Sequence, residues 1–259
     1  MGLTTGAGPL AAEPAPRNYD VTGPAHRIAF EPFGRRIRLR LGGETVLDTE
    51  DARLLHETAI RARLYVPLAD MRPDVLRASA TRSHCPFKGD ATYRSVEAGG
   101  VRAEDALWVY EEPLPAAGWL RGYAGVYEER FEQVLDEDEP VLGHVTDPYH
   151  RVELRSASRH VVVTGPDGAL LAETHRPLML AETGRERRLL IPREDVVATL
   201  SPGSRPPVPS PYTGTALRWT VAGVADSAVT YDDPPAGAAR LSGHVGFEGE
   251  GIELREVRD

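Results

Sequence analysis

The most constraining feature of this sequence is an internal repeat that spans nearly the whole chain. The segment HRIAFEPFGRRIRLRL begins at His26 and recurs as HRVELRSASRHVVVTG from His150, a shift of 124 from position 26 to position 150. The segment CPFKGDA from Cys85 likewise matches SPYTGTA from Ser210. A period of this length is typical of a duplicated domain rather than of a short solenoid repeat. We therefore expect both copies to adopt the same fold.

The repeat divides the chain into four parts. We expect an N-terminal extension at residues 1–25, a first repeat at 26–135, a linker at 136–149 and a second repeat at 150–259. The linker is inferred from the acidic, proline-containing run DEDEPVLGHVTD at 136–147, a composition typical of a solvated connection. We also expect the two repeats to pack on each other.

Each copy is dominated by short strand signals. Apolar residues alternate with arginine over residues 36–41, and residues 160–163 are rich in valine. Turn residues follow at Gly42-Gly43 and at 166–168, which predicts a hairpin in each copy. One short helix per copy is expected, at about 68–77 and 193–200. The fold class is therefore all-β, with two small tandem domains.

Composition excludes several classes of protein. The chain has a mass of 28.2 kDa, a net charge of -9 and a pI near 5.4, which disfavours a nucleic-acid partner because such proteins need a basic patch. No apolar run is long enough to span a membrane, and residues 1–25 lack the pattern of a signal peptide, so we expect a cytoplasmic protein. A single cysteine excludes an intrachain disulfide and paired-cysteine metal sites. We expect neither a metal nor a cofactor.

The chain contains one lysine, Lys88, among 30 basic residues. This skew is typical of a GC-rich bacterial genome that replaces lysine wherever any cation is adequate. The amine of a lysine, unlike a guanidinium, can lose its proton and offers a compact charge. Lys88 lies three residues after the only cysteine, Cys85, so the two residues form a candidate site. The alternative is one surface lysine that survived by chance.

Four motifs in the first copy resemble those of the domain of unknown function 427 family. They are YVPLADM, HCPFKGDATYRSV, DALWVYEEP and LRGYAGVYEERFEQV, in that order, and the second copy repeats their layout in degraded form. The family is similar in fold to the β-tent group, which includes the thalidomide-binding domain of cereblon and methionine sulfoxide reductase B. The zinc-binding CxxC pairs of several β-tent relatives are absent here, so the resemblance implies no zinc site. The family's nucleotidyltransferase-like label finds little support, because no Gly-Ser precedes an Asp-x-Asp.

The motif around Cys85 and Lys88 predicts a local reactive site. Residues three apart face opposite sides of a strand, so contact between the thiol and the amine would need the turn that Pro86 and Gly89 favour. A nearby cation would lower the pKa of the thiol. His84, in the same motif, could assist, although adjacent residues of a strand face opposite sides. Alternatively, Cys85 is a small buried residue of the core.

A second constellation consists of aromatic and charged residues. Trp108 and Tyr110 are two apart and so share a face of one strand, where aromatic rings can form the wall of a binding pocket. The alternative is that these rings are core. The full set of candidate ligand-binding residues is His84, Lys88, Asp90, Tyr93, Trp108, Tyr110, Glu112, Arg121 and Tyr123.

The second copy has lost the reactive-looking groups and kept others. Cys85, Lys88, Asp90, Tyr93 and Trp108 correspond to Ser210, Thr213, Thr215, Arg218 and Val229. Retained pairs include Glu57/Glu182, Thr58/Thr183, Pro67/Pro192, Asp70/Asp195, Pro86/Pro211, Gly89/Gly214, Tyr110/Tyr231 and Pro113/Pro234. We interpret the retained residues as scaffold and the first copy as the one with a working site.

Three hypotheses follow for the function. The leading one is a module that binds a small anionic or aromatic ligand in a pocket of the first repeat, with the Lys88 amine paired to the anion. The second is an enzyme that uses Cys85 as nucleophile or redox thiol, activated by Lys88. The third is a non-catalytic scaffold or interaction protein in which Lys88 bonds a carboxylate such as Glu111.

Overall fold

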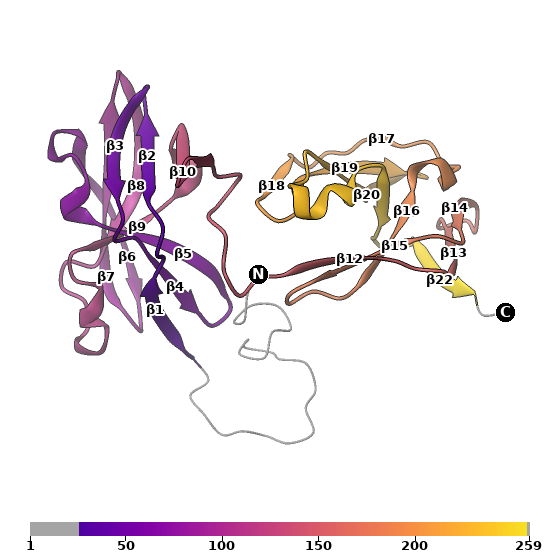
Figure 1. Ribbon diagram of the computed structural model, residues 1–259, viewed down its shortest axis with the longest axis horizontal. Coiled ribbons are helices and arrows are strands. Elements are labelled where there is room, and N and C mark those ends of the chain that lie inside the picture. The colour runs from indigo at the N-terminus through magenta and orange to yellow at the C-terminus, as the bar shows by residue number, and fades with distance from the viewer. Residues whose placement is uncertain (1–25, 258–259) are drawn as a thin grey trace. The chain divides into compact units, whose positions relative to one another are not determined.

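The computed structural model describes residues 26–257, and these residues fall into two compact units. The first unit ends at Asp147 and the second begins at Pro148. Both units are built of antiparallel strands joined by turns and short 3₁₀ helices, which confirms the all-β prediction (Figure 1). Within the described residues, no helix is long and apolar enough to cross a membrane.

The first unit contains two sheets. The larger has seven strands, in the order β1 (Ile28–Pro32), β4 (Arg53–Glu57), β5 (Ile60–Pro67), β9 (Tyr123–Val126), β8 (Val101–Val109), β7 (Gly89–Ala98) and β6 (Leu76–Cys85). The smaller has four, in the order β11 (Glu139–Pro140), β10 (Gln133–Asp136), β2 (Ile37–Leu41) and β3 (Glu44–Thr49).

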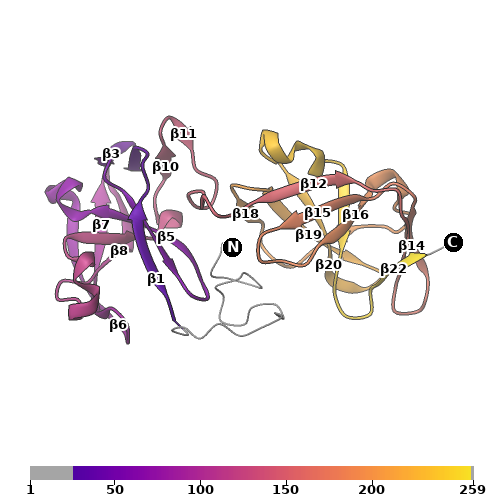
Figure 2. The same ribbon diagram turned by 60° about the horizontal axis from the view of Figure 1, so that its bottom comes forward.

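The second unit repeats this plan. Its larger sheet contains β12 (Val152–Ser156), β15 (Leu178–Glu182), β16 (Arg188–Pro192), β21 (His244–Phe247), β20 (Val224–Asp232), β19 (Gly214–Val221) and β17 (Ser201–Pro202), and β18 (Val208–Ser210) also pairs with β19. Its smaller sheet contains β14 (Leu170–Thr174), β13 (His160–Thr164) and β22 (Glu253–Val257) (Figure 2).

Both faces of each larger sheet are covered. In the first unit, Leu54 and Leu64 pack with β2 and β3 into the main core, whereas their neighbours Leu55 and Tyr65 belong to a separate cluster. Alternate residues of a strand point to opposite faces, so this division follows directly from the strand period of two. The second cluster includes Leu120 of the 3₁₀ helix η3 (Pro115–Leu120). Helix η6 (Ala236–Leu241) contributes Leu241 to the equivalent cluster of the second unit.

The predicted hairpins are present, but the predicted helices are not regular α-helices. Gly42 and Gly43 connect β2 to β3 with φ of 57° and 76°, a conformation that glycine adopts readily. The expected helix at 68–77 is instead two 3₁₀ turns, η1 (Leu68–Asp70) and η2 (Pro73–Val75), followed by β6. Pro73 restricts the residue before it to extended backbone, so an α-helix cannot continue across that position.

The expected helix at 193–200 is also wrong. The structure has a single 3₁₀ turn, η5 (Arg193–Asp195), after which the backbone is extended. Val196 then forms a β-bridge with Ala172, as Met71 does with Leu47 in the first unit. These bridges use backbone groups that a continuing helix would need, so each segment becomes a connection between the two sheets.

Most of the run expected to be a linker belongs to the first unit. Strands β10 and β11 extend the smaller sheet beside β2, and the amide of Glu137 donates to the carbonyl of Arg36 at 2.8 Å. Val145 is 4% exposed and packs in the main core, and its amide donates to Glu128 at 2.6 Å. Asp138 and Glu139 are exposed, whereas Val145 and even Asp147 are buried, a division that composition alone does not reveal.

Candidate functional site

The face of the larger first-unit sheet that lies under η3 is lined by aromatic side chains. Its cluster combines the buried Tyr65, Trp108 and Tyr110 with the half-buried Phe30 and Tyr123. The side chain of Phe30 meets Tyr65 and Tyr123 edge-on, with ring centroids 5.6 and 5.2 Å apart. Edge-to-face contacts of this kind are favourable and fix ring orientation. We call this set the aromatic face.

Trp108 forms the buried part of the aromatic face. It is 9% exposed, and its indole N–H donates to the hydroxyl of Tyr65 at 2.9 Å. The indole lies flat against Gly125 of β9, where a Cβ atom would be 2.0 Å from the ring. Glycine is thus required opposite Trp108. The indole is held by the protein itself, which is the core role that the sequence left open.

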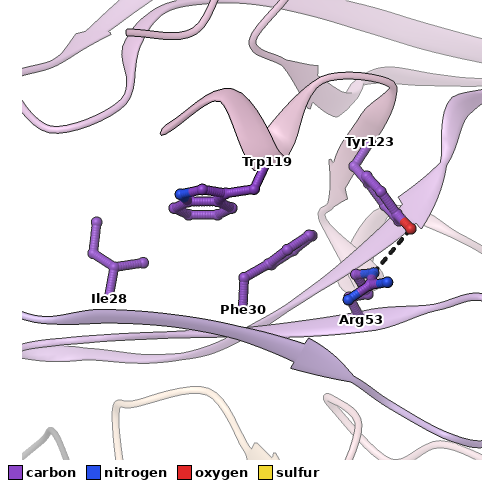
Figure 3. A pocket seen from close by; sticks show the side chains of 5 residues that line it. All are labelled: Ile28, Phe30, Arg53, Trp119 and Tyr123. Atoms are coloured by element: carbon purple, nitrogen blue, oxygen red, sulfur yellow. Dashed lines mark hydrogen bonds between the residues drawn. The ribbon is translucent and has the colours of Figure 1, made fainter. Parts of the chain in front are cut away.

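A pocket of about 340 Å³ opens beside the aromatic face. Its lining consists of Ile28 and Phe30 from β1, Arg53 from β4, Trp119 from η3 and Tyr123 from β9. Figure 3 shows the indole of Trp119 facing Phe30, with Arg53 and Tyr123 beside them. The Trp119 and Phe30 ring centroids are 5.0 Å apart, and Trp119 is 39% exposed. The pocket therefore has an accessible aromatic wall.

Arg53 supplies the charge of this pocket. Its Nε donates to the hydroxyl of Tyr123 at 2.9 Å, and its guanidinium carbon lies 5.5 Å from the ring centroids of both Phe30 and Tyr123. Within residues 26–257, no carboxylate forms an ion pair with Arg53. The tyrosine hydroxyl orients the guanidinium and leaves its terminal N–H groups available for an anion.

Lys88 is buried in a charge network on the same face. The amine is 5% exposed and forms an ion pair with Glu57, which is 3% exposed. The other oxygen of Glu57 lies 3.0 Å from Nε2 of His26, whose ring stacks on Phe87 with centroids 3.7 Å apart. The expected partner of the scaffold hypothesis, Glu111, instead pairs with Arg94. The charge of Lys88 is thus neutralised inside the protein.

Cys85 and Lys88 are joined by the turn that contact between them would require. The amide of Lys88 donates to the carbonyl of Cys85 at 3.2 Å, and Cys85 pairs with Gly89 at the end of the β6–β7 hairpin. The thiol is half-buried against the aromatic face. Burial, followed by the nearby thiol of Cys85, raises the pKa of Tyr110 above its usual range, so this hydroxyl stays protonated.

The remaining predicted residues are spread over several surfaces. His84 and Asp90 are exposed and pair with each other at 2.6 Å. The hydroxyl of Tyr93 lies 3.0 Å from that of Ser83, and Glu112 and Arg121 are exposed. Of the nine candidate ligand-binding residues, only Tyr123 lines the pocket described above.

Sequence reasoning missed the residues that give this face its chemistry. Glu57 was interpreted as scaffold, although its retention as Glu182 pointed to a buried role. Arg53 and Trp119 carried a signal of a different kind: they correspond to Leu178 and Arg240, so they change between the copies as Cys85 does. A comparison of the two copies at every aromatic and charged position would have included both residues among those that change.

Comparison with known families identifies both halves of the chain. The sequence profile described as Domain of unknown function (DUF427) matches residues 29–137 and again residues 153–258. The chain belongs to this family. It carries two DUF427 domains, as the sequence motifs predicted, and the two matches together cover most of its length. No match to a curated protein was found for the chain.

The second DUF427 domain has replaced the whole pocket lining. Ile28, Phe30, Arg53, Trp119 and Tyr123 correspond to Val152, Leu154, Leu178, Arg240 and His244. Arg240 donates to the hydroxyl of Ser156 at 2.6 Å and to the carbonyl of Leu154 at 3.5 Å, so it bonds the strand that Trp119 faces in the first domain. Three aromatic rings and the guanidinium of the pocket are thereby lost.

Proposed function

We propose that the first DUF427 domain binds a small planar ligand that carries an anionic group. The observation that supports this most directly is Arg53, a guanidinium without a carboxylate partner among residues 26–257, in a pocket with aromatic walls. Trp119 and Phe30 would contact the planar part of the ligand, and Arg53 would pair with its carboxylate or phosphate. A pocket of this size accepts a molecule of modest size rather than a polymer.

This proposal keeps the leading hypothesis from the sequence but moves its anion partner from Lys88 to Arg53. An amine that is buried and paired with Glu57 has little charge to offer a ligand, and releasing it would take from that buried carboxylate its lysine partner. Arg53, by contrast, can bind an anion without breaking an ion pair within the protein. The hypothesis of a thiol enzyme loses its activating cation for the same reason, because the charge of Lys88 is already balanced.

Binding can be tested with a panel of aryl acids, namely benzoate, 1-naphthoate and indole-3-acetate. Each acid is compared with its uncharged amide, and the measurements are thermal shift and titration calorimetry on the full chain. We expect at least one acid to bind more tightly than its amide. Arg53→Met should then weaken that binding by roughly tenfold to a hundredfold, since hydrogen bonds to charged groups contribute about 1.5–3 kcal/mol.

Two further variants locate the binding. Trp119→Ala should weaken it by roughly fivefold to tenfold through loss of the aromatic wall. Arg121→Met is the matched control, because Arg121 is an exposed arginine close in sequence that does not line the pocket. If none of the acids binds, or if binding survives both Arg53→Met and Trp119→Ala, the proposal is wrong and the scaffold hypothesis gains support.

A further inference from the structure

The hairpin of β13 and β14 in the second domain brings three metal-ligating side chains together. His160 begins β13, Glu173 lies in β14 and His175 follows it. The pairing of Val161 with Thr174 places His160 opposite His175, so all three side chains share one face of the hairpin. Their ligating atoms all lie within 4.8 Å of one another. The His160 and His175 rings stack with centroids 4.1 Å apart, and Nε2 of His160 is 2.7 Å from Glu173.

The equivalent place in the first domain holds a permanent cation. His160, Glu173 and His175 correspond to Arg36, Asp48 and Glu50. Nε of Arg36 donates to Asp48 at 2.7 Å, and a second guanidinium nitrogen lies 2.5 Å from the other carboxylate oxygen. The first domain thus pairs Asp48 with a guanidinium that belongs to the chain.

The second domain has no such fixed charge at this place. Unlike a guanidinium, an imidazole has a ring nitrogen that can offer a lone pair to a metal ion, and His160 and His175 bring two imidazoles to this place. Among the described residues, His160 is the one ion-pair partner of Glu173. In the second domain a histidine thus stands in place of Arg36, and a second histidine lies opposite it. The cation of the first domain is replaced by groups that can donate lone pairs to a metal ion.

We propose that His160, Glu173 and His175 bind a divalent transition-metal ion of the class of Zn²⁺. Two imidazole nitrogens and one carboxylate oxygen are a donor set that suits Zn²⁺, Ni²⁺ or Cu²⁺. In a tetrahedral site with bonds of about 2.0–2.1 Å, donor atoms lie about 3.3 Å apart. Nε2 of His160 and the Glu173 oxygen, now 2.7 Å apart, would therefore separate slightly, and any donor pair nearer the 4.8 Å limit would move closer. Their partial exposure permits this adjustment, and water would supply any further ligand. This site departs from the sequence-based expectation of no metal.

Calorimetric titration of the full chain with ZnCl₂ tests the proposal. The protein carries no histidine tag and is first dialysed against EDTA, so that every bound ion reports on the chain itself. We expect one ion per chain, and Co²⁺ in its place should give the visible absorption of a four-coordinate site. His160→Ala and His175→Ala should each weaken Zn²⁺ binding by more than about tenfold, which is the loss that even an outer-shell partner causes.

Matched variants exclude the other donors of the chain. His84→Ala removes the comparable exposed pair of His84 with Asp90, and Cys85→Ser removes the thiol, so binding should survive both. The double variant His160→Arg with His175→Glu gives this place the same charges as the trio of the first domain and should fold without binding Zn²⁺. The proposal is overturned by absence of Zn²⁺ binding, by loss of binding in His84→Ala or Cys85→Ser, or by unchanged binding in the double variant.

Discussion

The two DUF427 domains share their strand order and turns, which we call the frame, and differ in the side chains that line one face of the larger sheet. In both, a threonine at the end of a strand donates to an aspartate of the following 3₁₀ turn at 2.6 Å, Thr49 to Asp70 and Thr174 to Asp195. In the first domain the face under η3 holds Arg53 and accessible aromatic rings, whereas the second has aliphatic residues and a bonded arginine there. The fold therefore needs the turns and the core, and leaves the lining of this face free to change.

The buried charges show a subtler difference. Glu57 pairs with Lys88 from the β6–β7 hairpin, whereas its counterpart Glu182 pairs with two arginines, Arg185 at 3.2 Å and Arg188 of β16 at 3.3 Å. The position of Lys88 is taken by the buried Thr213. The same carboxylate has thus kept a cation while the strand that provides it has changed. A buried carboxylate without a cation would be costly, which accounts for the presence of a cationic partner in both domains.

The largest effect expected from this comparison is that of Lys88→Met. It removes the buried cation that pairs with Glu57 and leaves that carboxylate only the half-buried His26, so the first domain should lose up to about 3–5 kcal/mol of unfolding free energy. Thr213→Val, at the equivalent position of the second domain, should cost only about 1 kcal/mol because Arg188 still pairs with Glu182.

Tryptophan fluorescence separates the two domains in this experiment. Trp108 and Trp119 lie in the first domain and Trp219 in the second, so urea unfolding on a Trp219→Phe background reports on the first domain alone. The double variant Lys88→Met with Glu57→Gln should recover part of the loss. Equal, small effects of Lys88→Met and Thr213→Val would show that the buried pair makes no special contribution.

A pH-dependent effect of intermediate size should be confined to the first domain. Burial raises the pKa of Glu128 to about 7, whereas the second domain has Gly249 at this position. Because the folded-state pKa lies above the unfolded value of 4.5, the stabilisation is present below pH 4.5 and is lost as the pH rises through 7. Between pH 8 and 5, the unfolding free energy of the first domain should rise by up to about 3 kcal/mol from this group.

The variant Glu128→Gln isolates that contribution. Its amide oxygen can still accept from the amide of Val145 but does not titrate. Urea unfolding at several pH values, on the same Trp219→Phe background, should therefore give a flatter pH profile than that of Glu128. Profiles that run parallel would mean that the carboxyl group is not the source of the pH dependence.

The smallest difference is expected where the domains are most alike. Thr49→Val and Thr174→Val each remove a hydroxyl that donates to an aspartate, and both threonines are buried. Each variant should cost its own domain about 1–2 kcal/mol, with little difference between them. Peptide-level hydrogen exchange assigns each loss to a domain. A large asymmetry would show that the shared frame is stabilised differently in the two copies.

The sequence predicted the frame well because its signals are local. The duplication, the all-β class and the hairpin at Gly42-Gly43 follow from repeat spacing, strand periodicity and the backbone freedom of glycine. It also indicated that contact between Cys85 and Lys88 would need a turn, and the structure has a turn at this place. The helix at 68–77 failed at Pro73, where a proline fragments the segment into 3₁₀ turns.

The sequence by itself determined that this chain is two copies of one β domain, that both belong to one family, and that the first copy differs chemically from the second. Only the tertiary structure decided which differing residues act together. Sheet order places Arg53 and Glu57 of β4 on the face shared with residues from β1, β9 and η3, far away in the chain. The same order buries Lys88 against Glu57 and brings His160 beside His175. The period of two in a strand determines which face of the sheet a side chain lies on. Its partners from other strands depend on the strand order, which no local sequence pattern encodes.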